Sequence, residues 1–248
     1  MKVTPKLIFT IIYSLKGSGA KQKVKEIYND FASKHGKSKT KSNHAWCSET
    51  VSAGFIKANA TNLIGGIALW SPDHKRHFKQ LGIWKSGHDR VPNVGDIVVF
   101  QDKHGNPNHS ELVFSVNKSK GTFVALSGNY LGGIGFRTRK IHASNIHGYG
   151  CPKYNSYNTV TPTIVMNVLK GKYGKGAKIG TTRYDQLAMS GYDPDAVQAK
   201  INWVINTAQD IKNGKSNYGN DDERRQKLGI WYDVVQKQIN VLYGIDKW

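Results

Sequence analysis

The spacing of apolar residues changes from a helical period to a strand period within the first 150 residues. Apolar residues fall on one helix face in HAWCSETVSAGFIKA (44–58). Short segments rich in Val, Ile, Phe and Thr, separated by turn residues, then follow: GDIVVFQ (95–101), HSELVFSV (109–116), TFVALSGN (122–129) and GFRTRKIH (135–142). Two more helices, broken at KGSGAK, are expected within residues 5–34. Helices followed by an antiparallel meander predict an α+β domain.

The last third of the chain contains an internal repeat. DAVQAKIN (195–202) returns as DVVQKQIN (233–240), identical at five of eight positions, and LKGKYGKG (169–176) returns loosely as IKNGKSNYGND (211–221). Each copy has about 40 residues with helical periodicity, close to the lower limit for an independent fold. We therefore predict a first domain at 1–150, a linker at 151–162, and two small helical-bundle repeats at 163–206 and 207–248.

The net charge of +19 favours an anionic partner such as nucleic acid, a membrane surface or the polymers of a bacterial wall. The lysines are scattered and no nucleic-acid-binding module is recognisable, so no nucleic acid is expected. No apolar run approaches the roughly 20 residues of a membrane span. The short run LIFTIIYSL follows Pro5, which suits the first turn of an ordinary helix better than a cleaved signal. We expect a protein without a signal peptide or membrane span.

Cys47 lies in the first turn of the helix predicted within residues 44–58. The free N–H groups and partial positive charge of a helix N-terminus would lower the pKa of its thiol and could hold an oxyanion. From the residue alone, simple packing in the core remains open. The residues expected to act together with Cys47 lie on a hairpin that turns at KSKG (118–121). This turn would pair His109 with residues near 129–130. Asn129, which could also be a turn residue, would then lie beside His109. Cysteine, histidine and asparagine would supply nucleophile, base and orienting amide.

The motifs AWCSETVSAGF, PNVGDIVVF, NHSELVFSV and VALSGNY, in this order, resemble the CHAP family, the cysteine- and histidine-dependent amidohydrolases/peptidases of bacteriophage lysins. The resemblance covers about residues 5–145 and implies a papain-like fold with Cys47 as nucleophile, His109 as base and Asn129 as orienting residue. Many members carry a glutamate two residues before this asparagine, where this chain has Ser127. Some bind calcium through aspartate-rich loops near the cysteine. KSKTKSNHAWC has no carboxylate, so neither a metal nor a cofactor is expected.

The tail resembles the CPL-seven-type cell-wall-binding repeats of phage lysins, which bind the peptidoglycan muropeptide. The matching pieces are GKYGKG, SGYDPDAVQAKIN, YGNDDERRQKLG and DVVQKQIN. By this resemblance, Arg183 and Arg224 match the family's arginine before a leucine, and Tyr173 and Tyr218 match its aromatic–glycine pair. Core packing remains open for the tyrosines and a solvated helix face for the arginines.

These patterns predict a peptidoglycan hydrolase, a phage or prophage endolysin that cleaves a peptide or amide bond with a cysteine nucleophile. The expected partners are peptidoglycan and anionic wall polymers. We expect a monomer made in the host cytoplasm that acts on the wall after release. Endopeptidase and N-acetylmuramoyl-L-alanine amidase activities are not separable by sequence. A non-catalytic wall-binding protein and a basic nucleic-acid-binding protein remain alternatives.

Overall fold

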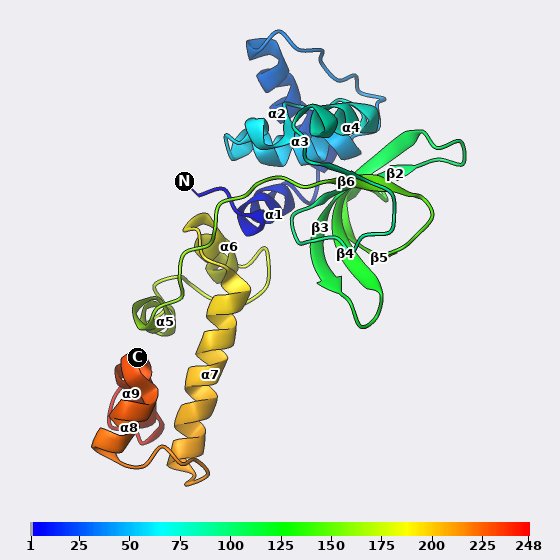
Figure 1. Ribbon diagram of the computed structural model, residues 1–248. Helices are drawn as coiled ribbons and strands as arrows, with labels where there is room; N and C mark the ends of the chain where they lie inside the picture. The colour runs from blue at the N-terminus through cyan, green and yellow to red at the C-terminus, as the bar shows by residue number, and fades with distance from the viewer. Residues whose placement is uncertain (1) are drawn as a thin grey trace. The chain divides into compact units, whose positions relative to one another are not determined.

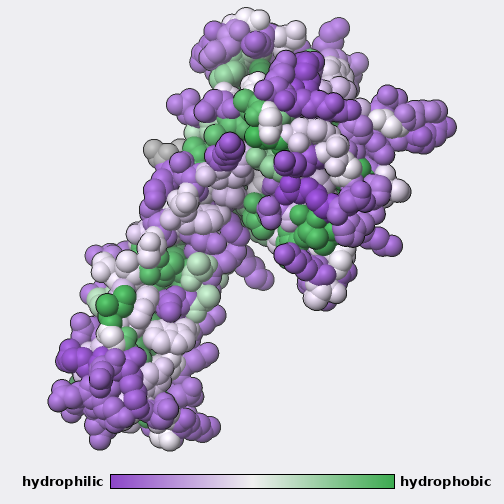
Figure 2. Space-filling view, viewed as in Figure 1, coloured by the Kyte–Doolittle hydropathy of each residue, from purple (hydrophilic) through white to green (hydrophobic). Residues whose placement is uncertain are grey.

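The computed structural model describes residues 2–248, which form two compact units (Figure 1). The first comprises Val3–Ser156, and the second comprises Tyr157–Trp248 together with Lys2. The division between Ser156 and Tyr157 falls inside the segment predicted as a linker, 151–162. Hydrophilic residues dominate the visible surface of both units (Figure 2), as the large excess of lysine and arginine would suggest. No helix among the described residues combines the length and apolarity needed to cross a membrane.

An antiparallel six-stranded sheet forms the framework of the first unit, in the order β1-β6-β2-β3-β4-β5. Its strands are β1 (Trp84–Ser86), β2 (Ile97–Gln101), β3 (Pro107–Asn117), β4 (Thr122–Tyr130), β5 (Gly133–Lys140) and β6 (Ile146–Gly150). The four strands predicted from sequence are β2 to β5, and they form the expected meander. Strands β1 and β6 were missed because they are short and poor in β-branched residues. Pairing of β6 with the buried strand β2, in the register Val98↔Tyr149, gives it its conformation.

Helices pack on this sheet, and the unit is a mixture of helices and antiparallel strands, as the α+β prediction requires. They are α1 (Pro5–Ser14), α2 (Ala20–Lys34), α3 (Cys47–Lys57), the 3₁₀ helix η1 (Thr61–Ile64) and α4 (Ser71–Gln80). Helices α3 and α4 both contact β3, and α3 also contacts β4. The approach to β4 is so close that a Cβ added to Gly128 would lie 1.9 Å from Thr50 Oγ1. A glycine at this position therefore lets the helix that begins at Cys47 seat against the sheet.

The second unit is built from the helical elements α5 (Pro162–Leu169), α6 (Thr182–Met189), α7 (Pro194–Lys212), α8 (Asp221–Leu228), η2 (Gly229–Trp231) and α9 (Tyr232–Leu242). The repeat boundary predicted between residues 206 and 207 lies within α7, so the two copies are continuous through one helix. The second half of α7 supplies Val204 and Ala208 to a core that also contains Val165 of the first copy and Val235 of the second. Because the copies share one core, they are not two separate bundles as predicted.

Candidate active site

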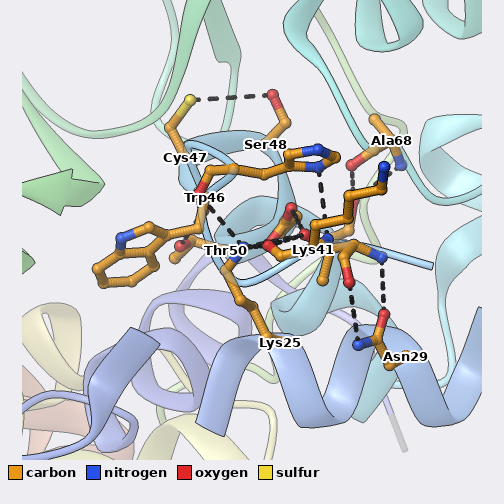
Figure 3. Close-up of polar contacts among 12 residues, drawn as sticks. Lys25, Asn29, Lys41, Trp46, Cys47, Ser48, Thr50 and Ala68 are labelled. Carbon is orange, nitrogen blue, oxygen red and sulfur yellow. Dashed lines mark hydrogen bonds and ion pairs between the residues drawn. The ribbon is translucent and has the colours of Figure 1, made fainter. Parts of the chain in front are cut away.

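Cys47 is the first residue of α3, and 4% of its surface is exposed. Trp46 occupies the N-cap position, and within residues 2–248 no side chain caps this end of the helix. The first N–H groups of the helix are therefore available to a developing negative charge beside the sulfur. Figure 3 shows Cys47 and Ser48 at this end of the helix, joined by a contact between Sγ and Oγ of 4.0 Å.

The segment that leads into Cys47 is attached to α2 by buried polar contacts (Figure 3). Lys25 donates to the carbonyls of Lys41 and His44 and to Thr40 Oγ1, and its Nζ lies 3.7 Å from the fully buried carboxylate of Glu49. Asn29 accepts a 2.8 Å hydrogen bond from the Thr40 backbone, so the turn before α3 is fastened to α2. Burial lowers the pKa of Lys25 and raises the pKa of Glu49, each partly opposed by the other's charge.

His109, on β3, hydrogen-bonds to the Cys47 thiol through its side chain. Its Nε2 atom lies 3.0 Å from Glu111 Oε1 and 3.2 Å from Ser127 Oγ. With Nε2 engaged in this way, Nδ1 is the ring nitrogen left to meet the sulfur. The structure thus brings together two of the three catalytic residues predicted from sequence, Cys47 and His109.

A buried carboxylate, which sequence reasoning missed, orients the imidazole. Glu111 has no exposed surface, and its two oxygens accept from Arg139 Nε at 2.9 Å and Arg139 Nη2 at 2.6 Å. His109 and Glu111 are two residues apart on a strand, so their side chains share one face of the sheet. That alternation was the available signal, because a charged residue in the buried half of a strand normally has a partner.

The charges of this group shift the pKa values of its members in a consistent direction. Burial raises the pKa of the Cys47 thiol, but hydrogen bonds and charge from His109, helped by the Ser110 backbone and the Ser48 hydroxyl, outweigh burial and bring it below its ordinary value. Burial lowers the pKa of His109, but hydrogen bonds to Cys47 and Glu111 raise it to about 9. Burial opposes ionisation of Glu111, yet His109 and Arg139 lower its pKa to about 2. The lowered pKa of the thiol and the raised pKa of the imidazole both favour the ion pair of a thiolate and an imidazolium.

Asn129 does not take the position predicted for it. The β3–β4 register Leu112↔Leu126 extrapolates to Asn129 opposite His109, but a bulge between Gly128 and Tyr130 disturbs the end of β4. Asn129 there has a φ of 60° and is exposed. No hydrogen bond in the described part of the chain joins it to His109. Ser127 contacts Nε2 instead, and the carboxylate comes from β3.

A cavity of about 230 Å³ opens beside the thiol. Its lining is mostly apolar: Ala45, Cys47, Ser48, Leu69, Trp70, Ser71, Pro72, Pro107 and Asn108. Trp70, 43% exposed, is a large aromatic surface at this cavity. The space next to the sulfur suits a small side chain or a stretch of peptide backbone.

The second cysteine lies apart from this chemistry. Cys151 is a free thiol like Cys47, it accepts from Arg90 Nη1 at 3.2 Å, and burial raises its pKa to about 11. A thiol with such a pKa is protonated at neutral pH and is a poor nucleophile. Among residues 2–248, no group of three or more His, Cys, Asp or Glu side chains is arranged to hold a metal ion.

The arginines predicted to bind the wall make similar internal hydrogen bonds in the two repeats, each to a glycine carbonyl in a loop and to the corresponding glutamine. Arg183 donates to the carbonyl of Gly176 at 2.9 Å and to Gln198 Oε1 at 2.6 Å. Arg224 donates to the carbonyl of Gly219 at 2.8 Å and to the corresponding glutamine, Gln236, at 2.9 Å. Each guanidinium therefore joins a loop to the last helix of its repeat, and its contact with the wall ligand stays a prediction.

The predicted tyrosines Tyr173 and Tyr218 are partly buried and pack against the shared core of the second unit. This placement fits the packing alternative considered from sequence. The partly exposed surface of each ring still lies in the loop that the repeat arginine fastens.

The family model of the CW_7 repeat matches residues 163–205. This part of the chain is similar to a cell-wall-binding repeat. The match covers α5, α6 and the first half of α7, and it nearly coincides with the first predicted repeat, 163–206. A cell-wall-binding role for the second unit follows. No curated protein and no solved structure matches this chain.

Proposed function

We propose that the protein is a peptidoglycan hydrolase of the endolysin type, in which the first unit is a CHAP-like, papain-like catalytic domain and the second holds it on the wall. The observation that carries the proposal is the Cys47 thiol at a helix N-terminus, with a lowered pKa and in hydrogen-bond contact with His109. The CW_7 repeat in the same chain supports the bacterial wall as the place of action.

In the proposed reaction, the Cys47 thiolate attacks the carbonyl carbon of a peptide or amide bond in the stem or cross-bridge. The developing oxyanion is held by N–H groups at the start of α3. The His109 imidazolium protonates the leaving amine, and the neutral ring then takes a proton from the water that hydrolyses the thioester. Glu111, clamped by Arg139, orients His109 and stabilises its charged form.

Mass spectrometry of purified peptidoglycan digested by the protein tests this proposal directly. Endopeptidase activity would create new peptide termini, whereas amidase activity would separate the stem peptide from N-acetylmuramic acid. Cys47→Ala should yield neither product. Retained wall binding without cleavage by the unaltered protein would favour a non-catalytic wall-binding protein instead.

A further inference from the structure

Four buried polar side chains lie behind the Cys47 thiol, and the reaction proposed above does not use them. Their exposed fractions are 1% for Ser48, 4% for Ser71, and 0% for both Ser110 and His74. They come from three different elements: Ser48 from α3, Ser71 and His74 from α4, and Ser110 from β3. His74 belongs to a segment with few apolar residues, yet it lies in the interior on α4.

The distances between these side chains define a continuous chain that ends at the sulfur. His74 Nδ1 lies 3.1 Å from Ser110 Oγ, which lies 3.1 Å from Ser71 Oγ. Ser71 Oγ lies 3.2 Å from Ser48 Oγ, which in turn lies 4.0 Å from Cys47 Sγ. The backbone of Ser110 also hydrogen-bonds to Cys47, so the contacts close a ring through the thiol.

The direction of these hydrogen bonds follows from the number of protons available. The Ser110 hydroxyl donates to Ser71, and a hydroxyl has only one proton to give. Ser110 must therefore accept from His74, which places the proton of the neutral ring on Nδ1. Ser71 therefore donates a hydrogen bond to Ser48, and Ser48 donates one to the sulfur. As a thiolate, the sulfur can only accept.

The surroundings of His74 keep it in the neutral form that this direction requires. Burial, with a smaller contribution from nearby His77, lowers its pKa to about 3 despite the opposing charge of Asp73. The ring stacks on Phe78 at a centroid distance of 5.3 Å and an angle of 7°. Its Nε2 atom is buried and has no hydrogen-bond partner among residues 2–248.

We propose that His74, Ser110, Ser71 and Ser48 form a one-way hydrogen-bond chain that positions and stabilises the Cys47 thiolate. His74 anchors the chain as a fixed donor, and Ser48 delivers the last hydrogen bond to the sulfur. Aligned hydrogen bonds between buried groups polarise one another, so loss of an inner member weakens the last one. These are positioning residues, and their importance for turnover rests on the proposed function, in which Cys47 is the nucleophile.

The chain lies on the opposite face of β3 from His109 and Glu111, because adjacent residues of a strand point to opposite faces. His74 is separated from the sulfur by three hydroxyl groups. It therefore does not compete with His109 as the base, and its effect on the thiol is expected to be through the hydroxyls alone.

Ser71→Ala interrupts the chain in the middle while leaving every residue that touches the thiol in place. The full chain with Cys151→Ser is alkylated with iodoacetamide across a pH series, and modification of Cys47 is followed by mass spectrometry. We expect the apparent thiol pKa to rise by about 0.5 or more, the net contribution of roughly one hydrogen bond. Turnover should fall about three- to tenfold.

Ser52→Ala is the matched control. Ser52 is also fully buried on α3, but its hydroxyl bonds the Ala68 backbone, at 2.9 Å from the nitrogen, and has no connection to Cys47. It should lower stability in a similar way without moving the thiol pKa. Equal thiol pKa values in Ser71→Ala and Ser52→Ala would overturn the proposal.

His74 is tested by a pair of variants at the far end of the chain. His74→Leu should raise the thiol pKa as Ser71→Ala does, whereas His74→Asn, which keeps an N–H near the Nδ1 position, should restore most of the shift. Both variants are first compared by circular dichroism. If His74→Leu does not fold, the comparison of Ser71→Ala with Ser52→Ala decides the proposal. A folded His74→Leu with an unchanged thiol pKa would contradict the anchoring role.

The alkylation measurement requires no cleavage of peptidoglycan. A protein that cuts no wall but shows the expected pKa shift in Ser71→Ala would contradict the proposed function and leave the chain supported. A protein that cuts the wall but shows no pKa shift in Ser71→Ala would support the proposed function and contradict the hydrogen-bond chain.

Discussion

Arginine side chains have different roles in the two units. In the first, Arg139 is bound to a fully buried carboxylate, and this charge pair acts on His109, so its effect is electrostatic. In the second, Arg183 and Arg224 bind neutral carbonyl and amide oxygens and fasten loops. The same side chain thus tunes protonation where its partner is an anion and supports backbone structure where its partners are neutral. Substitution of Arg139 should therefore change the protonation of the site in the first unit. Substitution of Arg183 or Arg224 should change the order of a loop in the second.

The largest effect is expected from removing the thiol. Cys47→Ala should abolish cleavage of purified peptidoglycan, since no other described thiol has a lowered pKa, while pull-down by the wall should persist through the second unit. Cys151→Ser is the matched control, because the raised pKa of Cys151 keeps it protonated; it should retain activity. Equal loss of activity in both variants would contradict the assignment of Cys47.

Glu111→Gln should be the next most damaging change. Loss of the carboxylate removes a cause of the high pKa of His109, so this pKa should fall from about 9 toward the ordinary 6.5. Activity, which we expect to decline above about pH 9 as the imidazolium deprotonates, should then decline at a lower pH, and turnover near neutral pH should drop at least about tenfold. The pH profile of turnover is the measurement, and an unmoved alkaline limit would refute the role of Glu111.

The pKa shifts of Glu111 and His109 predict how the stability of the protein depends on pH. The lowered pKa of Glu111, about 2, contributes stability that is present above its ordinary value and is lost as the pH falls toward 2. The raised pKa of His109 contributes stability that is complete below about 6.5 and is lost as the pH rises through about 9. Denaturant unfolding followed across pH should show both losses. In Glu111→Gln, the acid loss should be smaller than in the unaltered protein.

Arg183→Ala should loosen a loop and leave cleavage chemistry intact. Two hydrogen bonds disappear, a cost of about 1–3 kcal/mol in local stability. Amide hydrogen exchange of the full chain should therefore accelerate in residues 170–181. Wall binding should weaken in proportion to this loosening. Arg225→Ala is the control, because Arg225 is exposed and its charge loss is the same. Weaker binding by Arg183→Ala with unchanged exchange would instead indicate direct contact with the wall ligand.

Asn129→Ala should have the smallest effect, less than about twofold on turnover, because the exposed Asn129 has no hydrogen bond to His109. A loss as large as that of Glu111→Gln would restore the role predicted for it from sequence. Replacing an αL asparagine by alanine also costs some backbone energy, so activity is compared at a temperature well below unfolding.

The sequence by itself determined the elements with local signals. Three such features depend on residues only a few positions apart, and all were predicted. They are the apolar helix face that follows Cys47, the Val- and Phe-rich strands β2 to β5, and the repeated DxVQxxIN pattern. Cys47 at a helix N-terminus and His109 near a strand end were predicted for the same reason. The resemblance to wall-binding repeats was also readable, and residues 163–205 match that family.

Only the tertiary structure decided which side chains complete the site. A one-residue bulge in β4 leaves Asn129 exposed, and the alternation of β3 brings Glu111 under His109, where Arg139 of β5 neutralises it. Helix α4 carries few apolar residues, so its period gave no signal, and its burial of His74 depends on packing against β3. The fusion of the repeats through α7 depends likewise on a core shared by residues far apart in sequence. Long-range pairing and burial set these outcomes, because a side chain's partner across a sheet or core is fixed by register and packing and not by its neighbours in the chain.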